Sequence, residues 1–296
     1  MTSPRYGIQP PAFRLPAATR LGQVRLQVSD LGRSMAFYED VLGLRAERHG
    51  AASATLRAAD GRVLVALDSR PGVTAAPRGA VGLYHFAILL PGRDDLGRFL
   101  RHLVNAGVHP GMADHLVSEA LYLSDPDGLG IEVYADRPRD QWQAQGRELA
   151  MATEPLDAPG VMAAAGDTAW AGMPAGTVMG HVHLHVGDLD AGAAFYHAAL
   201  GLDRIVWSYP GALFMSAGGY HHHLGTNTWA RGAAPRDDQA RLLSWDLIVP
   251  REDEAAAAAA SLAAAGYGVR DETGAFIAAD PWGTALRIAA DRNQDR

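Results

Sequence analysis

The amino-acid sequence predicts an α+β protein built from four similar modules, each a strand, a helix and further strands. The first observation is an internal repeat: residues 22–44 (GQVRLQVSDLGRSMAFYEDVLGL) align without gaps with residues 180–202 (GHVHLHVGDLDAGAAFYHAALGL). The second is a pair of hairpin signals, SDPDGLGIEVYAD at 124–136 and ADPWGTALRIAAD at 279–291, because Asp-Pro-x-Gly favours a tight turn. A repeat of this kind indicates a modular fold.

The elements follow in the order of the modules. Each copy of the first repeat begins with alternating residues, typical of a strand, and continues after an Asp-Leu turn into a helical pattern that ends at glycine. In the second and fourth modules, strands at 84–91 and 244–250 precede helices at 94–106 and 252–265. The modules therefore span about 21–70, 83–136, 180–230 and 242–291.

The modules predict two domains, 21–136 and 180–291, which follow an N-terminal arm at 1–20 and are joined by a linker at 137–179. The linker is rich in proline, glycine and alanine, and we expect a short helix within it at 141–150. A single module leaves part of its sheet face bare, so the modules must pair around a cavity. We expect two paired half-barrel sheets with the helices outside.

Composition narrows the partners and the metal ligands. The 296 residues are 48% hydrophobic and 20% charged, as in ordinary globular proteins, and the net charge of −7 argues against nucleic acid or anionic membranes as partners. The absence of cysteine leaves His, Asp, Glu or backbone oxygen to hold any metal, which favours iron, manganese or zinc. With neither a secretory signal nor a membrane-spanning run, the expected location is cytoplasmic.

Histidines concentrate in two stretches. In residues 179–186 (MGHVHLHV), three histidines alternate with aliphatic residues and so share one face of a strand. Three imidazoles on one face predict a polar cavity, a metal site or both. The second stretch is Tyr220 followed by three histidines. If it is a strand, His221 and His223 face the cavity, while His222 faces the helix-packing side.

These strings resemble the vicinal oxygen chelate superfamily, which has the glyoxalase/bleomycin resistance/dioxygenase fold. GLYHFAILLP, DHLVSEALYLSDPDGLGIEVYADRP, GHVHLHV and GGYHHHLGTNTW are similar to its ring-cleaving branch, typified by catechol 2,3-dioxygenases. The resemblance covers nearly all of residues 21–291. It implies a divalent metal, usually Fe(II), and O2-dependent cleavage beside the hydroxyls of a catechol.

The resemblance also implies that metal ligands come from the start of a module's first strand and the Glu position of its last strand. The second module carries His85 and Glu132 there, and the third carries His181. The first and fourth modules instead carry Gln23, Trp245 and Arg287. We therefore expect modules two and three to pair around a 2-His-1-carboxylate site that suits Fe(II), with modules one and four as a scaffold. Taken singly, the three candidates could be a core histidine, a solvated carboxylate and a strand cap.

Further residues are expected around the metal. The resemblance implies roles next to the metal for His115 and Tyr122, although Tyr122 could also be a packing residue. His223 is expected either as a fourth ligand or as an acid and base. Substrate contacts are expected from His183, His221, Asn227 and Trp229. Core positions are expected for Tyr84, Phe86, Phe214 and Met215.

The sequence thus predicts an extradiol dioxygenase that uses Fe(II) and O2 to cleave a small aromatic diol of the catechol type. One alternative is a glyoxalase-like lyase or isomerase, whose Zn, Ni or Mn would be held by a closed set of His85, Glu132, His181 and His223. Another is a small-molecule binding or resistance protein of the same fold. The ring substituents, the choice between catechol and hydroquinone, and self-association into a homo-oligomer stay open.

Overall fold

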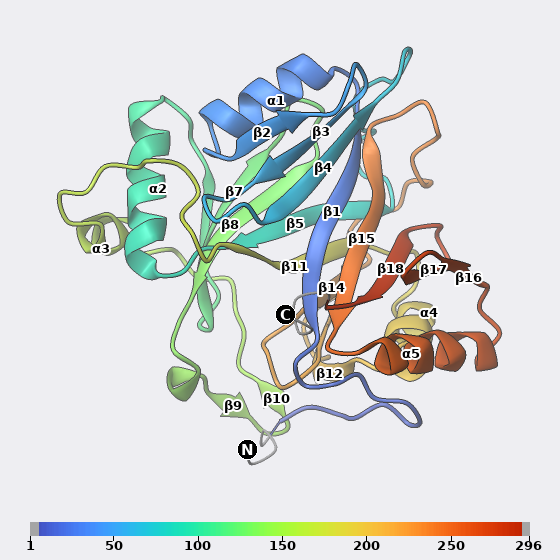
Figure 1. Cartoon of the computed structure of the whole chain (residues 1–296). Helices are drawn as coiled ribbons and strands as arrows, with labels where there is room; N and C mark the ends of the chain where they lie inside the picture. The colour runs from blue at the N-terminus through green and yellow to red at the C-terminus, as the bar shows by residue number, and fades with distance from the viewer. Residues whose placement is uncertain (1–5, 292–296) are drawn as a thin grey trace.

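Two eight-stranded sheets carry the fold, and each takes strands from both halves of the chain (Figure 1). The structure is a computed structural model that describes residues 6–291. The first sheet runs from edge to edge as β16 (Val269–Glu272), β17 (Ala275–Ala279), β18 (Ala285–Ala290), β15 (Arg241–Val249), β1 (Arg20–Val28), β4 (Val63–Ser69), β3 (Ser53–Arg57) and β2 (Arg45–Arg48). The second runs as β12 (Asp203–Val206), β13 (Ala212–Ser216), β14 (Leu224–Asn227), β11 (Val178–His185), β5 (Gly82–Leu89), β8 (Gly130–Asp136), β7 (Ser118–Ser124) and β6 (Gly111–Asp114).

The strand order confirms the predicted pairing of modules. In the first sheet, β1 of module one lies antiparallel to β15 of module four. In the second sheet, β5 of module two lies antiparallel to β11 of module three, with His183 opposite His85 and His181 opposite Ala87. The histidine-rich strand therefore meets the candidate ligands of module two at the centre of one sheet.

The helices cover the outer faces of the sheets, as predicted (Figure 1). They are α1 (Leu31–Asp40), α2 (Arg93–Asn105), α4 (Leu189–Ala193), which continues into a π-helical turn at Ala194–Ala199, and α5 (Glu252–Ala264). The repeated Asp-Leu turn places Asp30 and Asp188 as N-caps, whose side chains accept hydrogen bonds from the Arg33 and Ala191 amides. Within residues 6–291, no helix is long and apolar enough to cross a membrane.

The repeated tyrosine and the Asp-Pro-x-Gly turns belong to one structural device. The buried hydroxyl of Tyr38 donates to Asp125 at 3.3 Å, and that of Tyr196 donates to Asp280 at 2.8 Å. Each tyrosine comes from the first helical segment of a half of the chain, and each aspartate begins the turn of the last hairpin in the same half. These bonds connect consecutive modules that belong to different sheets.

The connection at 137–179 differs from expectation. Residues 141–150 form no helix; a 3-10 turn at Arg139–Gln141 precedes a two-stranded hairpin of β9 (Ala144–Gln145) and β10 (Glu148–Leu149). Gly146 makes the turn at φ 65°, a conformation that glycine adopts readily. Trp142 and Leu149 pack into a small apolar cluster beside β12, which holds the hairpin against the second sheet. Further along, α3 (Ala158–Ala164) packs on α2.

Candidate metal centre

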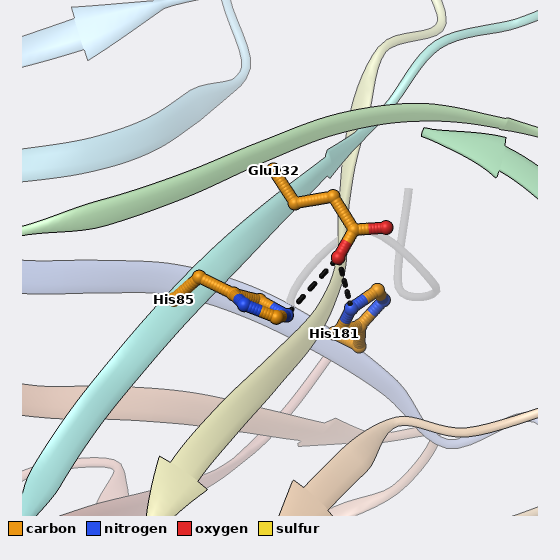
Figure 2. Close-up of side chains that lie close together, drawn as sticks. All are labelled: His85, Glu132 and His181. Carbon is orange, nitrogen blue, oxygen red and sulfur yellow. Dashed lines mark hydrogen bonds and ion pairs between the residues drawn. The ribbon is translucent and has the colours of Figure 1, made fainter. Parts of the chain in front are cut away.

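Three neighbouring strands bring the predicted ligands together. His85 lies on β5, Glu132 on β8 and His181 on β11, and their candidate ligand atoms all lie within 4.8 Å of one another. All three side chains are buried, and Figure 2 shows them pointing toward a common centre. The sheet register produces this convergence, because Ala87 pairs with both Glu132 and His181 on its two sides.

One carboxylate oxygen lies between the two imidazoles. Glu132 Oε2 is 3.0 Å from His85 Nε2 and 3.1 Å from His181 Nε2 (Figure 2). Among the described residues, however, His85 Nε2 is a buried nitrogen that makes no hydrogen bond with acceptable geometry. A buried polar atom normally has a partner, so this unbonded nitrogen beside a carboxylate fits a site for a cation. The three residues can hold a divalent metal.

The electrostatics of the cluster favour the protonation states that metal binding requires. Burial lowers the pKa of His181 to about 4, although Glu132 acts in the opposite direction. Burial alone would raise the pKa of Glu132, but His181 and His85 outweigh it and hold that pKa well below its usual value. A neutral imidazole and an ionised carboxylate are the forms that coordinate metals.

A cavity of about 320 Å³ opens on this cluster. His85, Glu132, His183 and His222 supply polar groups to its wall, and Tyr84, Tyr209, Phe214 and Trp229 supply aromatic rings. The prediction that Tyr84 is a core residue is therefore wrong, whereas Phe86, Phe214 and Met215 are buried in the core as predicted, and Phe214 also lines the cavity. Tyr84 is 39% exposed, and its ring packs edge-on against Trp229 and His183. The cavity combines a polar floor with aromatic walls.

His115 and Tyr122 meet at the cavity wall. His115 Nε2 lies 2.6 Å from the Tyr122 hydroxyl, and His115 Nδ1 lies 2.7 Å from the carbonyl oxygen of Ala152. A carbonyl oxygen only accepts, so Nδ1 carries the proton and, in the neutral ring, Nε2 accepts from Tyr122. Burial, aided by the charge of Glu132, raises the pKa of Tyr122 well above its usual value, which keeps the phenol protonated.

His183 lies on the cavity wall, as predicted, but Asn227 does not. Asn227 is fully buried between two histidines: its Nδ2 donates to His183 Nε2 at 3.0 Å, and its Oδ1 accepts from His185 Nδ1 at 2.6 Å. A substrate contact was expected from Asn227, but its amide is engaged by His185, its register partner on β11, and by His183. Trp229 lies at the mouth, 46% exposed, as predicted.

The structure places His222, and not His223, at the cavity. Residues 220–223 precede β14 and are not extended strand, so the alternation that predicted their faces does not apply. The ring centroids of His222 and His181 lie 4.0 Å apart. Burial and the neighbouring His181 hold the pKa of His222 well below its usual value. His223 instead accepts a hydrogen bond from the Ala217 amide through Nδ1, and burial lowers its pKa to about 3.

His221 is also turned away from the cavity wall, contrary to expectation, and bonds to Asp136 and His222. Sequence reasoning missed His222, although a signal was present. Gly218 and Gly219 come directly before the histidines, and a Gly-Gly pair predicts a turn rather than a continuous strand. Both glycines have positive φ, 63° and 67°.

Paired βαβββ modules with a buried 2-His-1-Glu cluster define a class of proteins that bind a metal ion between two modules. The model of the Glyoxalase/Bleomycin resistance protein/Dioxygenase superfamily matches residues 20–133 and 178–288, and the chain belongs to this superfamily. It is similar to a protein named catechol-2,3-dioxygenase from Bacillus subtilis (strain 168), with 44% identity over 270 residues that cover 89% of this chain and 94% of the relative.

Solved structures share the fold. A putative dioxygenase from Bacillus subtilis subsp. subtilis str. 168 superposes with a TM-score of 0.63 at 15% identity, covering 95% of this chain and 87% of the other. Glyoxalase I from Zea mays superposes with a TM-score of 0.52 at 16% identity, covering 92% of each chain. Because these identities are low, the structural matches support the architecture alone.

Proposed function

We propose that this protein is an extradiol dioxygenase that uses Fe(II) and O2 to cleave the ring of a catechol-type diol beside its hydroxyls. The observation that carries the proposal is the convergence of His85, Glu132 and His181 on one buried point beside an aromatic-walled cavity. Three protein ligands leave coordination positions free, as 2-His-1-carboxylate iron sites do. The catechol-2,3-dioxygenase relative supports the same reaction.

Iron held by these three residues would supply the Lewis acidity and the redox chemistry that the diol and O2 require. The surrounding side chains have other tasks. Tyr84, Phe214 and Trp229 offer flat apolar surfaces against which an aromatic ring can pack. They also exclude water from the reacting atoms, which strengthens electrostatic interactions inside the site.

Proton transfer falls to the histidines, and Tyr122 can orient a substrate hydroxyl. A catechol must lose hydroxyl protons before its ring can be oxidised, and a neutral imidazole beside the metal can accept one. His222 is the neutral imidazole that the structure places next to His181. The phenol of Tyr122 donates its one proton to His115 Nε2, so its oxygen can accept a hydrogen bond from a substrate hydroxyl in the cavity. His183 lines the cavity, is held in place by its hydrogen bond from Asn227, and can contact the bound diol.

The lyase or isomerase alternative required a closed set of four ligands that includes His223. The hydrogen bond between His223 and the Ala217 amide keeps that residue outside the cluster, which disfavours this alternative. A metal-free binding protein would have no use for a buried ionised carboxylate between two imidazoles, because burying such a charge without a cation is costly.

Anaerobic purification followed by metal analysis and a diol screen tests the proposal. We expect one iron atom per chain and O2 uptake on addition of a catechol. The reaction should consume one O2 for each ring cleaved and give a yellow ring-opened product. Hydroquinones in the same screen determine whether the two hydroxyls must be adjacent. Zinc or nickel in the purified protein, with no O2 uptake after iron loading, would overturn the proposal.

A further inference from the structure

A chain of hydrogen bonds runs from the cavity wall to the surface of the second sheet. His222 Nδ1 lies 2.7 Å from His221 Nδ1, and His221 Nε2 lies 2.9 Å from Asp136 Oδ1. His221 is fully buried, whereas the Asp136 side chain is 26% exposed. A histidine beside the metal cluster is thus linked, through a second histidine, to a carboxylate outside the cavity.

The last strand of module two carries both Glu132 of the metal cluster and Asp136 of the hydrogen-bond chain. Glu132, Tyr134 and Asp136 alternate along β8 and so project from the same face. The Tyr134 hydroxyl lies 2.7 Å from that of Tyr220, which donates to Asp136 Oδ1 at 3.2 Å. Gly180 leaves room for the Tyr134 ring, because a Cβ there would lie 1.9 Å from the phenol oxygen.

The donors and acceptors in this chain have one consistent direction. The Asp136 carboxylate only accepts, so His221 Nε2 carries a proton. The neutral His221 ring has a single N–H, which makes its Nδ1 an acceptor. The proton between the two rings therefore belongs to His222 Nδ1. Within residues 6–291, no hydrogen bond engages His222 Nε2, which keeps its lone pair for the cavity.

We propose that Asp136 is a positioning residue that acts through His221 to hold His222 in the tautomer with Nδ1 protonated and Nε2 free. His222 then meets the diol as a proton acceptor and not as a donor. The inference rests on the proposed function for its catalytic meaning, since the proton comes from a substrate hydroxyl. The tautomer itself is a property of the protein alone.

Replacing Asp136 by asparagine allows the donors and acceptors of these hydrogen bonds to exchange roles, while the side chain at position 136 keeps nearly the same shape. The Asn amide can donate to His221 Nε2, which permits a proton on His221 Nδ1, an acceptor at His222 Nδ1 and a proton on His222 Nε2. The wrong tautomer removes the acceptor from the cavity. We expect kcat to fall on the order of 10²-fold, at the lower end of general base contributions, with KM and metal content retained.

The direct readout is the ¹⁵N NMR spectrum of the histidine rings in the full-length protein loaded with diamagnetic zinc. His222 signals are assigned by their loss in His222→Gln. We expect a protonated Nδ1 and an unprotonated Nε2 in the wild type, and loss of this pattern in Asp136→Asn. Asp136→Glu, which keeps a carboxylate, should restore the pattern. Tyr220→Phe removes the other donor to Asp136 and should leave the tautomer unchanged.

A protonated His222 Nε2 in the wild type would overturn the inference, as would an Asp136→Asn protein whose tautomer and kcat match the wild type. The thermal midpoint and zinc content of each variant separate a tautomer change from misfolding. The NMR result does not depend on turnover. A wild type with the expected tautomer but no activity on any diol would therefore contradict the proposed function and leave the tautomer assignment standing.

Discussion

The centres of the two sheets have the same backbone pairing but different side chains. In the second sheet, Glu132 lies opposite Ala87, and in the first sheet Arg287 lies opposite Asp246. Arg287 Nη1 is 3.2 Å from Asp246 Oδ2, so the first sheet contains its own cation at this position. The second sheet contains a carboxylate between the imidazoles of His85 and His181, with no arginine or lysine paired to it among the described residues. The comparison supports the proposal that the second sheet, and not the first, is the one that binds a metal.

The largest expected effect comes from breaking the metal-binding side of this comparison. Glu132→Gln removes the negative charge that would neutralise part of the metal's charge. We expect metal affinity and dioxygenase activity to fall by more than about 10²-fold. This exceeds the effect of replacing residues that only hydrogen-bond to a metal ligand. The measurement is iron per chain after anaerobic gel filtration, together with O2 uptake.

The matched control lies in the other sheet. Asp246→Asn changes a carboxylate to an amide at the central position of the scaffold and should retain one iron per chain. Loss of metal from Asp246→Asn, or full retention in Glu132→Gln, would contradict the division of roles between the sheets.

The pairing of modules and the convergence of the ligands could be predicted from the sequence, because a repeat reports on backbone architecture. Four modules with ligand residues in the middle two have a simple solution, in which the middle two meet. The placement of His222 could not be predicted this way. Side-chain direction was inferred from strand alternation, and the Gly218-Gly219 turn interrupts the strand just before the histidines. Because residues 220–223 are not extended strand, alternation does not give the directions of their side chains.

The aromatic rings that line the cavity could not be predicted from the sequence either. Tyr84 and Phe214 lie in strands whose neighbours are buried, and the repeat does not distinguish a ring that faces a cavity from one that faces a helix. That distinction depends on the curvature of the sheet, which results from contacts between segments far apart in the chain. The hairpin at β9 and β10 depends likewise on the apolar cluster that receives Trp142 and Leu149.

The second expected effect separates His222 from His223, which neighbour each other in the sequence but have different environments. His222→Gln should lower kcat by on the order of 10² to 10⁴-fold, the usual contribution of a general base, with iron content unchanged. His223→Gln should keep most of the activity and lose about 1 kcal/mol of stability, because it disturbs one hydrogen bond to the Ala217 amide. Steady-state kinetics and urea unfolding measure the two effects. The reverse order of activities would restore His223 as the residue at the cavity.

The smallest expected effect concerns the pH dependence of the scaffold. Burial raises the pKa of Asp246 to about 6, although Arg287 acts against this. A carboxyl whose pKa is higher in the folded than in the unfolded state contributes stability that is present below its ordinary pKa and is lost as the pH rises through about 6. Asp246→Asn removes this loss. As the pH rises from 4 to 8, the free energy of unfolding of the variant should therefore increase by on the order of 1–3 kcal/mol relative to that of the wild type.

Urea unfolding of both proteins in a chelating buffer measures this difference without a contribution from bound metal. Parallel stability curves for the wild type and Asp246→Asn across this pH range would show that the ion pair with Arg287 keeps the carboxylate charged when folded. The scaffold sheet would then resemble the metal-binding sheet more closely than the structure indicates.

The central claim is that a single metal binds in the second sheet, between His85, Glu132 and His181. The measurement that tests it most directly is anomalous X-ray scattering at the iron absorption edge from crystals of the anaerobically loaded protein. We predict one anomalous peak per chain, within bonding distance of those three side chains. A peak beside Asp246 and Gln23 in the first sheet, or no peak in crystals of active enzyme, would contradict the account.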